Sequence, residues 1–149
     1  MSTLASIRPD SFNFPLFVHV LGAMVLVGGM VFAITAELVA AGSATPERFR
    51  RIAFRTFLLV ALPAYVVMRA GAEWIHSKEF PKGVEDPTWV GIGFITADGG
   101  AIVLLVTLIL AGVASARGKP GLGRAAAVLA AIALAGWLVA IWAMGAKPS

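Results

Sequence analysis

The fold is decided by residues 13–37, which read NFPLFVHVLGAMVLVGGMVFAITAE. From residue 14 to residue 36 this stretch is apolar except for His19 and Thr35. At a rise of 1.5 Å per residue it forms a helix of about 35 Å, long enough to cross a hydrocarbon core of about 30 Å. The stretch therefore predicts a membrane span.

One face of this predicted helix carries small residues together with the imidazole. At helical spacing, that face contains His19, Gly22, Leu26, Gly29, Ala33 and Ala36. Small side chains let helices approach closely in lipid, and polar groups there turn toward protein rather than acyl chains. We therefore expect this face to contact other helices of a bundle.

The composition of the whole chain also indicates a membrane protein. Hydrophobic residues make up 59% of the 149 residues and charged residues 13%, whereas about 25% are charged in soluble domains. Cysteine is absent, which excludes disulfides, iron–sulfur clusters and thiol catalysis. The length suits four spans with short connections, so residues 1–149 are expected to form a single integral-membrane domain.

Three further apolar segments follow the first. The predicted spans cover residues 14–40, 53–76, 88–116 and 124–146. The second is unusual because its uncharged part, between Arg55 and Arg69, is only about 20 Å long, so Arg69 is expected to lie within the membrane. Pro63 predicts a kink in this span. Asp86 and Pro87 predict the cap and first turn of the third helix, starting at Thr88 or Trp89.

The distribution of cations predicts the orientation. Loops one and three with their flanks hold seven cations, namely Arg48, Arg50, Arg51, Arg55, Arg117, Lys119 and Arg124. The opposite side holds four, namely Arg8, Lys78, Lys82 and Lys147. By the positive-inside rule both termini are non-cytoplasmic. The prediction is an all-α, up-down four-helix transmembrane bundle, multi-pass in the inner (plasma) membrane.

The same placement of cations bears on partners. These side chains lie in short loops between apolar segments, where they set orientation rather than form a face for a polyanion. Nucleic acid is therefore not expected as a partner. The expected environment is the lipid bilayer, with a homo-oligomer or another subunit of a membrane complex as the protein partner.

Ionisable residues of three spans are predicted to meet in the outer half of the bundle. Tyr65, Arg69, Glu73 and His76 follow spacings of four, four and three, which place them on one helical stripe. Asp98 is the single charge within the third span. Two interpretations are open: a buried network that fixes helix register, or a site for a ligand, an ion or a proton.

The ligand interpretation has two variants. His19 and His76, on neighbouring antiparallel helices, could be axial ligands of b-type haem, with Arg69 beside a propionate. Copper held by His19, His76 and a methionine such as Met24 or Met68 is the second variant. Proton or solute transfer through Glu73 and Asp98, in an oligomer, is a different class of function.

A family resemblance bears on the first helix. HVLGAMVLVGG, residues 19–29, resembles the His-x-x-Gly-x5-Gly-Gly opening of small bacterial integral-membrane proteins related to copper-resistance D proteins, and of a related predicted membrane family. This resemblance implies a membrane protein in which His19 meets copper or haem.

The sequence thus favours a non-catalytic membrane protein that binds haem or copper for electron transfer or metal handling. The alternatives are a structural or assembly subunit of a membrane complex, and a small oligomeric proton or solute transporter that uses Asp98 and Glu73.

Overall fold

The computed structural model describes residues 10–80 and 86–146, which are almost entirely helical. Arg8, Lys82 and Lys147, which entered the count of cations, lie outside the described residues. The elements are a 3-10 turn at Asp10–Phe12, α1 at Asn13–Gly42, α2 at Pro46–Thr56, a π-helical turn η2 at Phe57–Ala61, α3 at Leu62–Glu79, α4 at Thr88–Arg117 and α5 at Pro120–Ala146.

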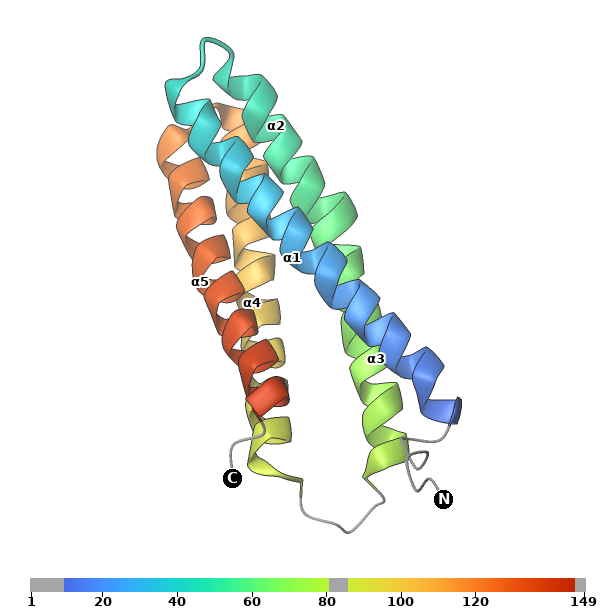
Figure 1. Ribbon diagram of the computed structural model, residues 1–149. Helices are drawn as coiled ribbons and strands as arrows, with labels where there is room; N and C mark the ends of the chain where they lie inside the picture. Colours follow the sequence, from blue (N-terminus) through green and yellow to red (C-terminus); the bar gives the residue numbers. More distant parts are fainter. Residues whose placement is uncertain (1–9, 81–85, 147–149) are drawn as a thin grey trace, which may run out of the picture.

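Because α2, η2 and α3 continue as a single rod, the described residues form four long helices side by side (Figure 1). All four are long and apolar enough to cross a membrane. The predicted all-α, up-down four-helix transmembrane bundle is therefore confirmed. Figure 1 shows the start of α1 and the end of α5 at one end of the bundle, here called the termini end. The other end, with the α1–α2 and α4–α5 connections, is called the arginine end.

The π-helical turn in the second rod has a local cause. Pro63 has no backbone N–H, so it cannot bond the carbonyl four residues earlier as a regular helix requires. The N–H of Leu62 instead bonds the carbonyl of Phe57, five residues back. Such a turn keeps the helix continuous up to the proline, although the regular pattern of backbone hydrogen bonds is interrupted there. The sequence predicted a kink at Pro63, and the structure places η2 directly before it.

The two ends of α4 are set by different residues, Pro87 before the helix and Gly118 after it. The helix begins at Thr88, one of the two predicted positions, but Pro87 occupies the cap position without a side-chain capping bond. The predicted role of Asp86 as the cap is therefore wrong. At the other end, Gly118 adopts the left-handed conformation with φ 63°, which ends a helix without the strain that a Cβ atom would introduce.

Glycine residues bring α1 and α3 into backbone contact. A Cβ atom added to Gly22 would lie 2.5 Å from the Met68 nitrogen, and one added to Gly71 would lie 2.6 Å from the His19 nitrogen. Neither position has room for a side chain. The face of α1 predicted to contact other helices is buried from Gly22 to Ala36, with His19 partly buried at its start, so that prediction is confirmed.

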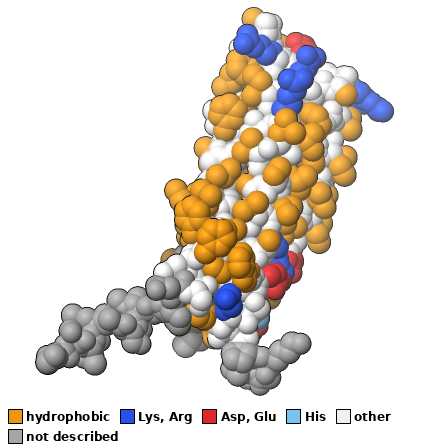
Figure 2. Space-filling model, turned by 90° about the vertical axis from the view of Figure 1, so that its right-hand side faces the viewer, with side chains coloured by type: hydrophobic (Ala, Val, Ile, Leu, Met, Phe, Trp, Pro, Cys, Tyr) orange, Lys and Arg blue, Asp and Glu red, His pale blue; other side chains and the backbone are white. Residues whose placement is uncertain are grey.

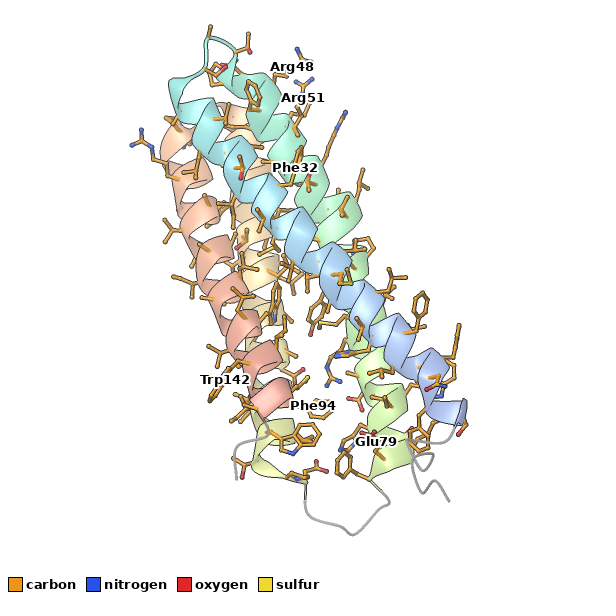
Figure 3. The ribbon with its side chains drawn as sticks, in the orientation of Figure 1. Phe32, Arg48, Arg51, Glu79, Phe94 and Trp142 are labelled. Atoms are coloured by element: carbon orange, nitrogen blue, oxygen red, sulfur yellow. The ribbon has the colours of Figure 1, made fainter. Side chains whose placement is uncertain are left out.

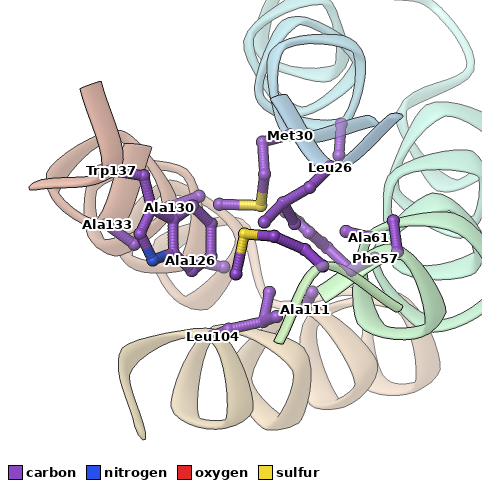
Figure 4. Packing of buried hydrophobic residues seen from close by; sticks show 13 residues of the cluster. Leu26, Met30, Phe57, Ala61, Leu104, Ala111, Ala126, Ala130, Ala133 and Trp137 are labelled. Atoms are coloured by element: carbon purple, nitrogen blue, oxygen red, sulfur yellow. The ribbon is translucent and has the colours of Figure 1, made fainter. Parts of the chain in front are cut away.

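The other pair, α4 and α5, also packs closely. The buried face of α5 is mostly alanine, and Trp137 lies over Gly100 of α4, where an added Cβ atom would clash with its Nε1. The core between the two pairs contains Leu26, Met30, Phe57 and Leu104, together with Ala126, Ala130 and Ala133 of α5 (Figure 4).

The outer surface has the character expected in lipid. Large hydrophobic side chains are exposed on every helix of the bundle. Figure 2 shows them over the middle of the visible face, with lysine and arginine side chains at the upper end and others, beside acidic side chains, toward the lower end. This banded surface supports the prediction of a multi-pass membrane protein.

Replacing Gly22 by valine is expected to lower the free energy of unfolding by about 1–3 kcal/mol, the usual range for overpacking, because the new side chain meets the Met68 backbone. Gly28→Val is the matched control on the same helix, since a Cβ atom there meets nothing within 4 Å. The measurement is unfolding in detergent followed by circular dichroism. Equal loss in both variants would contradict the close crossing.

Candidate functional site

A cavity of about 640 Å³ lies at the termini end, between the α1–α3 pair and the α4–α5 pair. It exists because α3 and α4 hardly touch, and Figure 1 shows the two pairs diverging toward this end. Most of its walls are apolar, with Trp89, Phe94 and Trp137 among them. Figure 3 shows Phe94 in the space between α3 and the α4–α5 pair. His19, Arg69 and His76 also line it.

His19 is held by the crossing of α1 and α3. Its Nδ1 lies 2.9 Å from the carbonyl oxygen of Met68, the residue whose backbone Gly22 contacts. A carbonyl oxygen only accepts hydrogen bonds, so Nδ1 carries the proton in this bond. In the neutral ring, Nε2 then keeps its lone pair. The structure thus fixes which nitrogen of His19 is free to bind a ligand.

Arg69 joins α3 to α4. Its Nε donates to Asp98 Oδ1 at 3.1 Å, its Nη1 donates to Glu73 Oε1, and its guanidinium carbon lies 4.7 Å from the centre of the Phe94 ring. Arg69 lines the cavity, whereas Glu73 and Asp98 do not. Their side chains are 56% and 62% exposed. The predicted polar stripe therefore meets the Asp98 carboxylate at the outer surface between the two helices.

Tyr65 lies one turn before Arg69 and forms separate contacts. Its hydroxyl donates to the carbonyl oxygen of Ala97 at 3.3 Å, and its ring stacks on Trp137 with the centroids 6.1 Å apart. It thus adds a second polar link between α3 and α4. This link is one residue along α4 from the ion pair at Asp98.

His76 is at the mouth of the cavity. Its Nε2 lies 2.9 Å from Asp86 Oδ1, and its ring lies 5.3 Å from that of Phe80 and 5.2 Å from that of Phe94. An ionised carboxylate only accepts hydrogen bonds, so Nε2 is the donor. This bond, rather than a helix cap, is the role of Asp86 in the structure.

The residues proposed as metal ligands do not all lie at the same site. His19 and His76 line the same cavity, Met68 is buried beside His19, and Met24 is exposed on the outside of α1. Residues 10–80 and 86–146 contain no group of three or more histidine, cysteine or acidic side chains that could hold a metal ion.

Two buried charges at the arginine end were missed by the sequence reasoning. Glu37 of α1 is 5% exposed and Arg50 of α2 is 7% exposed. A Cβ atom on Gly123 of α5 would clash with Glu37 Oε2, so this glycine makes room for the carboxylate. Glu37 Oε1 and Arg50 Nε have no hydrogen-bond partner among the described residues. The two charges attract each other electrostatically within the junction of α1, α2 and α5.

A signal for Glu37 was present in the sequence. Continuing the buried face of α1 by four residues from Ala33 reaches Glu37, and the next buried residue on it is Ala40. No pattern in the sequence predicts the burial of Arg50, because the residue lies among exposed arginines in the most basic segment of the chain. It was counted with the loop cations, yet its side chain lies inside the bundle.

Comparison with protein-family models, curated proteins and solved structures finds no match to this chain. The resemblance of residues 19–29 to copper-resistance D-type proteins therefore stays a prediction.

Glu37→Leu is expected to destabilise the protein by about 0.5–3 kcal/mol, because it removes the opposite charge that attracts the buried guanidinium of Arg50. Adding Arg50→Met should restore most of the stability, since two apolar side chains replace two buried charges. Both are measured by unfolding in detergent. A double variant as unstable as the single one would show that the charges do not compensate each other.

Proposed function

We propose that this multi-pass membrane protein binds b-type haem in the cavity at its termini end, with His19 as an axial ligand, for electron transfer. The observation that carries this proposal is the bond from His19 Nδ1 to the Met68 carbonyl. Histidine ligands of metals almost always donate their other ring N–H to such an acceptor, which fixes the tautomer and orients the ring.

The cavity suits a flat, largely apolar group. Its volume of about 640 Å³ is within the usual range of about 300–1,000 Å³ for ligand sites. Trp89, Phe94 and Trp137 supply aromatic wall surface. Haem iron supplies one-electron chemistry when it is bound in such a site. The chain itself contributes the His19 nitrogen and largely apolar walls.

Two of the expected contacts fit haem less well. Arg69 already binds the carboxylates of Glu73 and Asp98, so its predicted role beside a propionate would require competition with both. The Nε2 of His76 is engaged by Asp86. The proposal therefore relies on His19 as the protein ligand, with His76 as part of the wall.

The other interpretations gain less support. Copper would have two histidines on the cavity wall, with no third histidine, cysteine or acidic ligand grouped with them among the described residues. Transfer of a proton or solute through Glu73 and Asp98 lacks a path through the cavity, because neither carboxylate lines it. Assembly with a partner is supported by the exposed carboxylates of Glu73 and Asp98.

Titration of the detergent-purified protein with haemin tests the proposal. We expect about one haem per chain with a sharp Soret band, and at least tenfold weaker binding in His19→Ala because the ligating nitrogen is lost. His76→Ala is the matched control and should change the affinity by less than about threefold. Haemin in empty micelles gives the background.

Equal binding by the wild-type protein and His19→Ala, or a spectrum that matches empty micelles, would overturn the assignment. Circular dichroism melting of each variant shows whether it is folded at the titration temperature.

A further inference from the structure

Asp98 lies on the exposed face of α4, beside Arg69 of α3. Ile95, Ile102 and Ile109 share this face at helical spacing and are 75%, 67% and 65% exposed. An isoleucine side chain is favourable against acyl chains, whereas an ionised carboxylate in contact with them is costly. The exposed Asp98 therefore interrupts a surface that otherwise suits lipid.

The depth of Asp98 makes this exposure costly. The 30 residues of α4 span about 45 Å, so a hydrocarbon core of about 30 Å centred on the helix leaves about 7 Å at each end. Asp98 is about 15 Å from the start of α4 and thus about 8 Å inside the core. Arg69 lies at the same distance from the end of α3. The ion pair is therefore below the membrane surface.

The charges of this cluster do not cancel. Arg69 donates to both Glu73 and Asp98, so one guanidinium faces two carboxylates and the cluster carries a net charge of −1 when all three groups are ionised. Both carboxylates are more than half exposed. Each has oxygen lone pairs that can accept from a further donor. The cluster thus attracts a cation from outside the bundle.

We propose that the surface around Asp98 is an assembly site for a transmembrane helix that carries a lysine or arginine at the same depth. The added cation neutralises the cluster and removes the carboxylates from lipid, while Ile95 and Ile102 pack against the apolar part of that helix. A second copy of this chain fits less well, because it would bring another cluster of net charge −1 to the contact. The site lies outside the cavity and is independent of any ligand bound there.

Model peptides test this charge requirement. The probe is a Leu/Ala transmembrane peptide of roughly 20 residues with one lysine about 8 Å inside one end, and its control has leucine at that position. Association with the labelled protein is measured by fluorescence energy transfer in phosphatidylcholine vesicles. We expect the lysine peptide to bind at least tenfold more tightly than the leucine peptide.

Two variants locate the effect. Glu73→Gln removes the excess charge but keeps the bond between Arg69 and Asp98, so it should abolish most of the lysine preference in a folded protein. Asp98→Asn should act in the same direction. Glu47→Gln, which removes an exposed carboxylate from α2 at the arginine end, should leave the preference unchanged.

Three results would overturn the proposal. The first is equal binding of the two peptides, and the second is an unchanged lysine preference in Glu73→Gln. The third is energy transfer between two labelled copies of the chain that Asp98→Asn abolishes, which would identify the surface as a self-association site.

Discussion

The backbone contact between α1 and α3 is the interaction on which the rest of the termini end depends. Gly22 and Gly71 each occupy a point where the opposite helix leaves no room for a Cβ atom. This contact brings the Met68 carbonyl within hydrogen-bond distance of His19. A larger residue at either glycine would separate the helices, and the imidazole would lose the acceptor that sets its tautomer. Helix packing and the chemistry of His19 are thus consequences of the same two glycines.

The cavity follows from a difference between the two ends of the bundle. At the arginine end, α1 contacts α5 and α2 contacts α4, and Glu37 and Arg50 are enclosed there. At the termini end, α3 and α4 have few contacts. They are linked by the Arg69–Asp98 pair, by the bond from Tyr65 to Ala97, and by the contacts of His76 and Arg69 with the Phe94 ring. The space between them is filled only in part by aromatic side chains.

The sequence predicted the features that depend on one helix at a time. Length and hydropathy were enough for four spans, and the spacing of small residues was enough for the buried face of α1. Features that depend on a second helix were harder to predict. Burial of Arg50 is decided by where α2 packs in the bundle, and the room for Glu37 is made by Gly123 on α5. The direction of Asp98 was also hard to predict, because the residues around it on α4 are apolar on every face, so hydrophobicity alone does not show which face is inside.

Arg69 shows why proximity of polar residues in a sequence pattern does not define a common site. Its side chain lines the cavity and lies over Phe94, yet its two hydrogen-bonded carboxylates face the outside of the bundle. A guanidinium with two carboxylate partners has little remaining attraction for a third anion. The haem proposed for the cavity would therefore meet His19 and the apolar walls, while the excess negative charge lies at the outer surface. The polar cluster expected from the sequence is thus divided by Arg69 into an inner and an outer part with different chemistry.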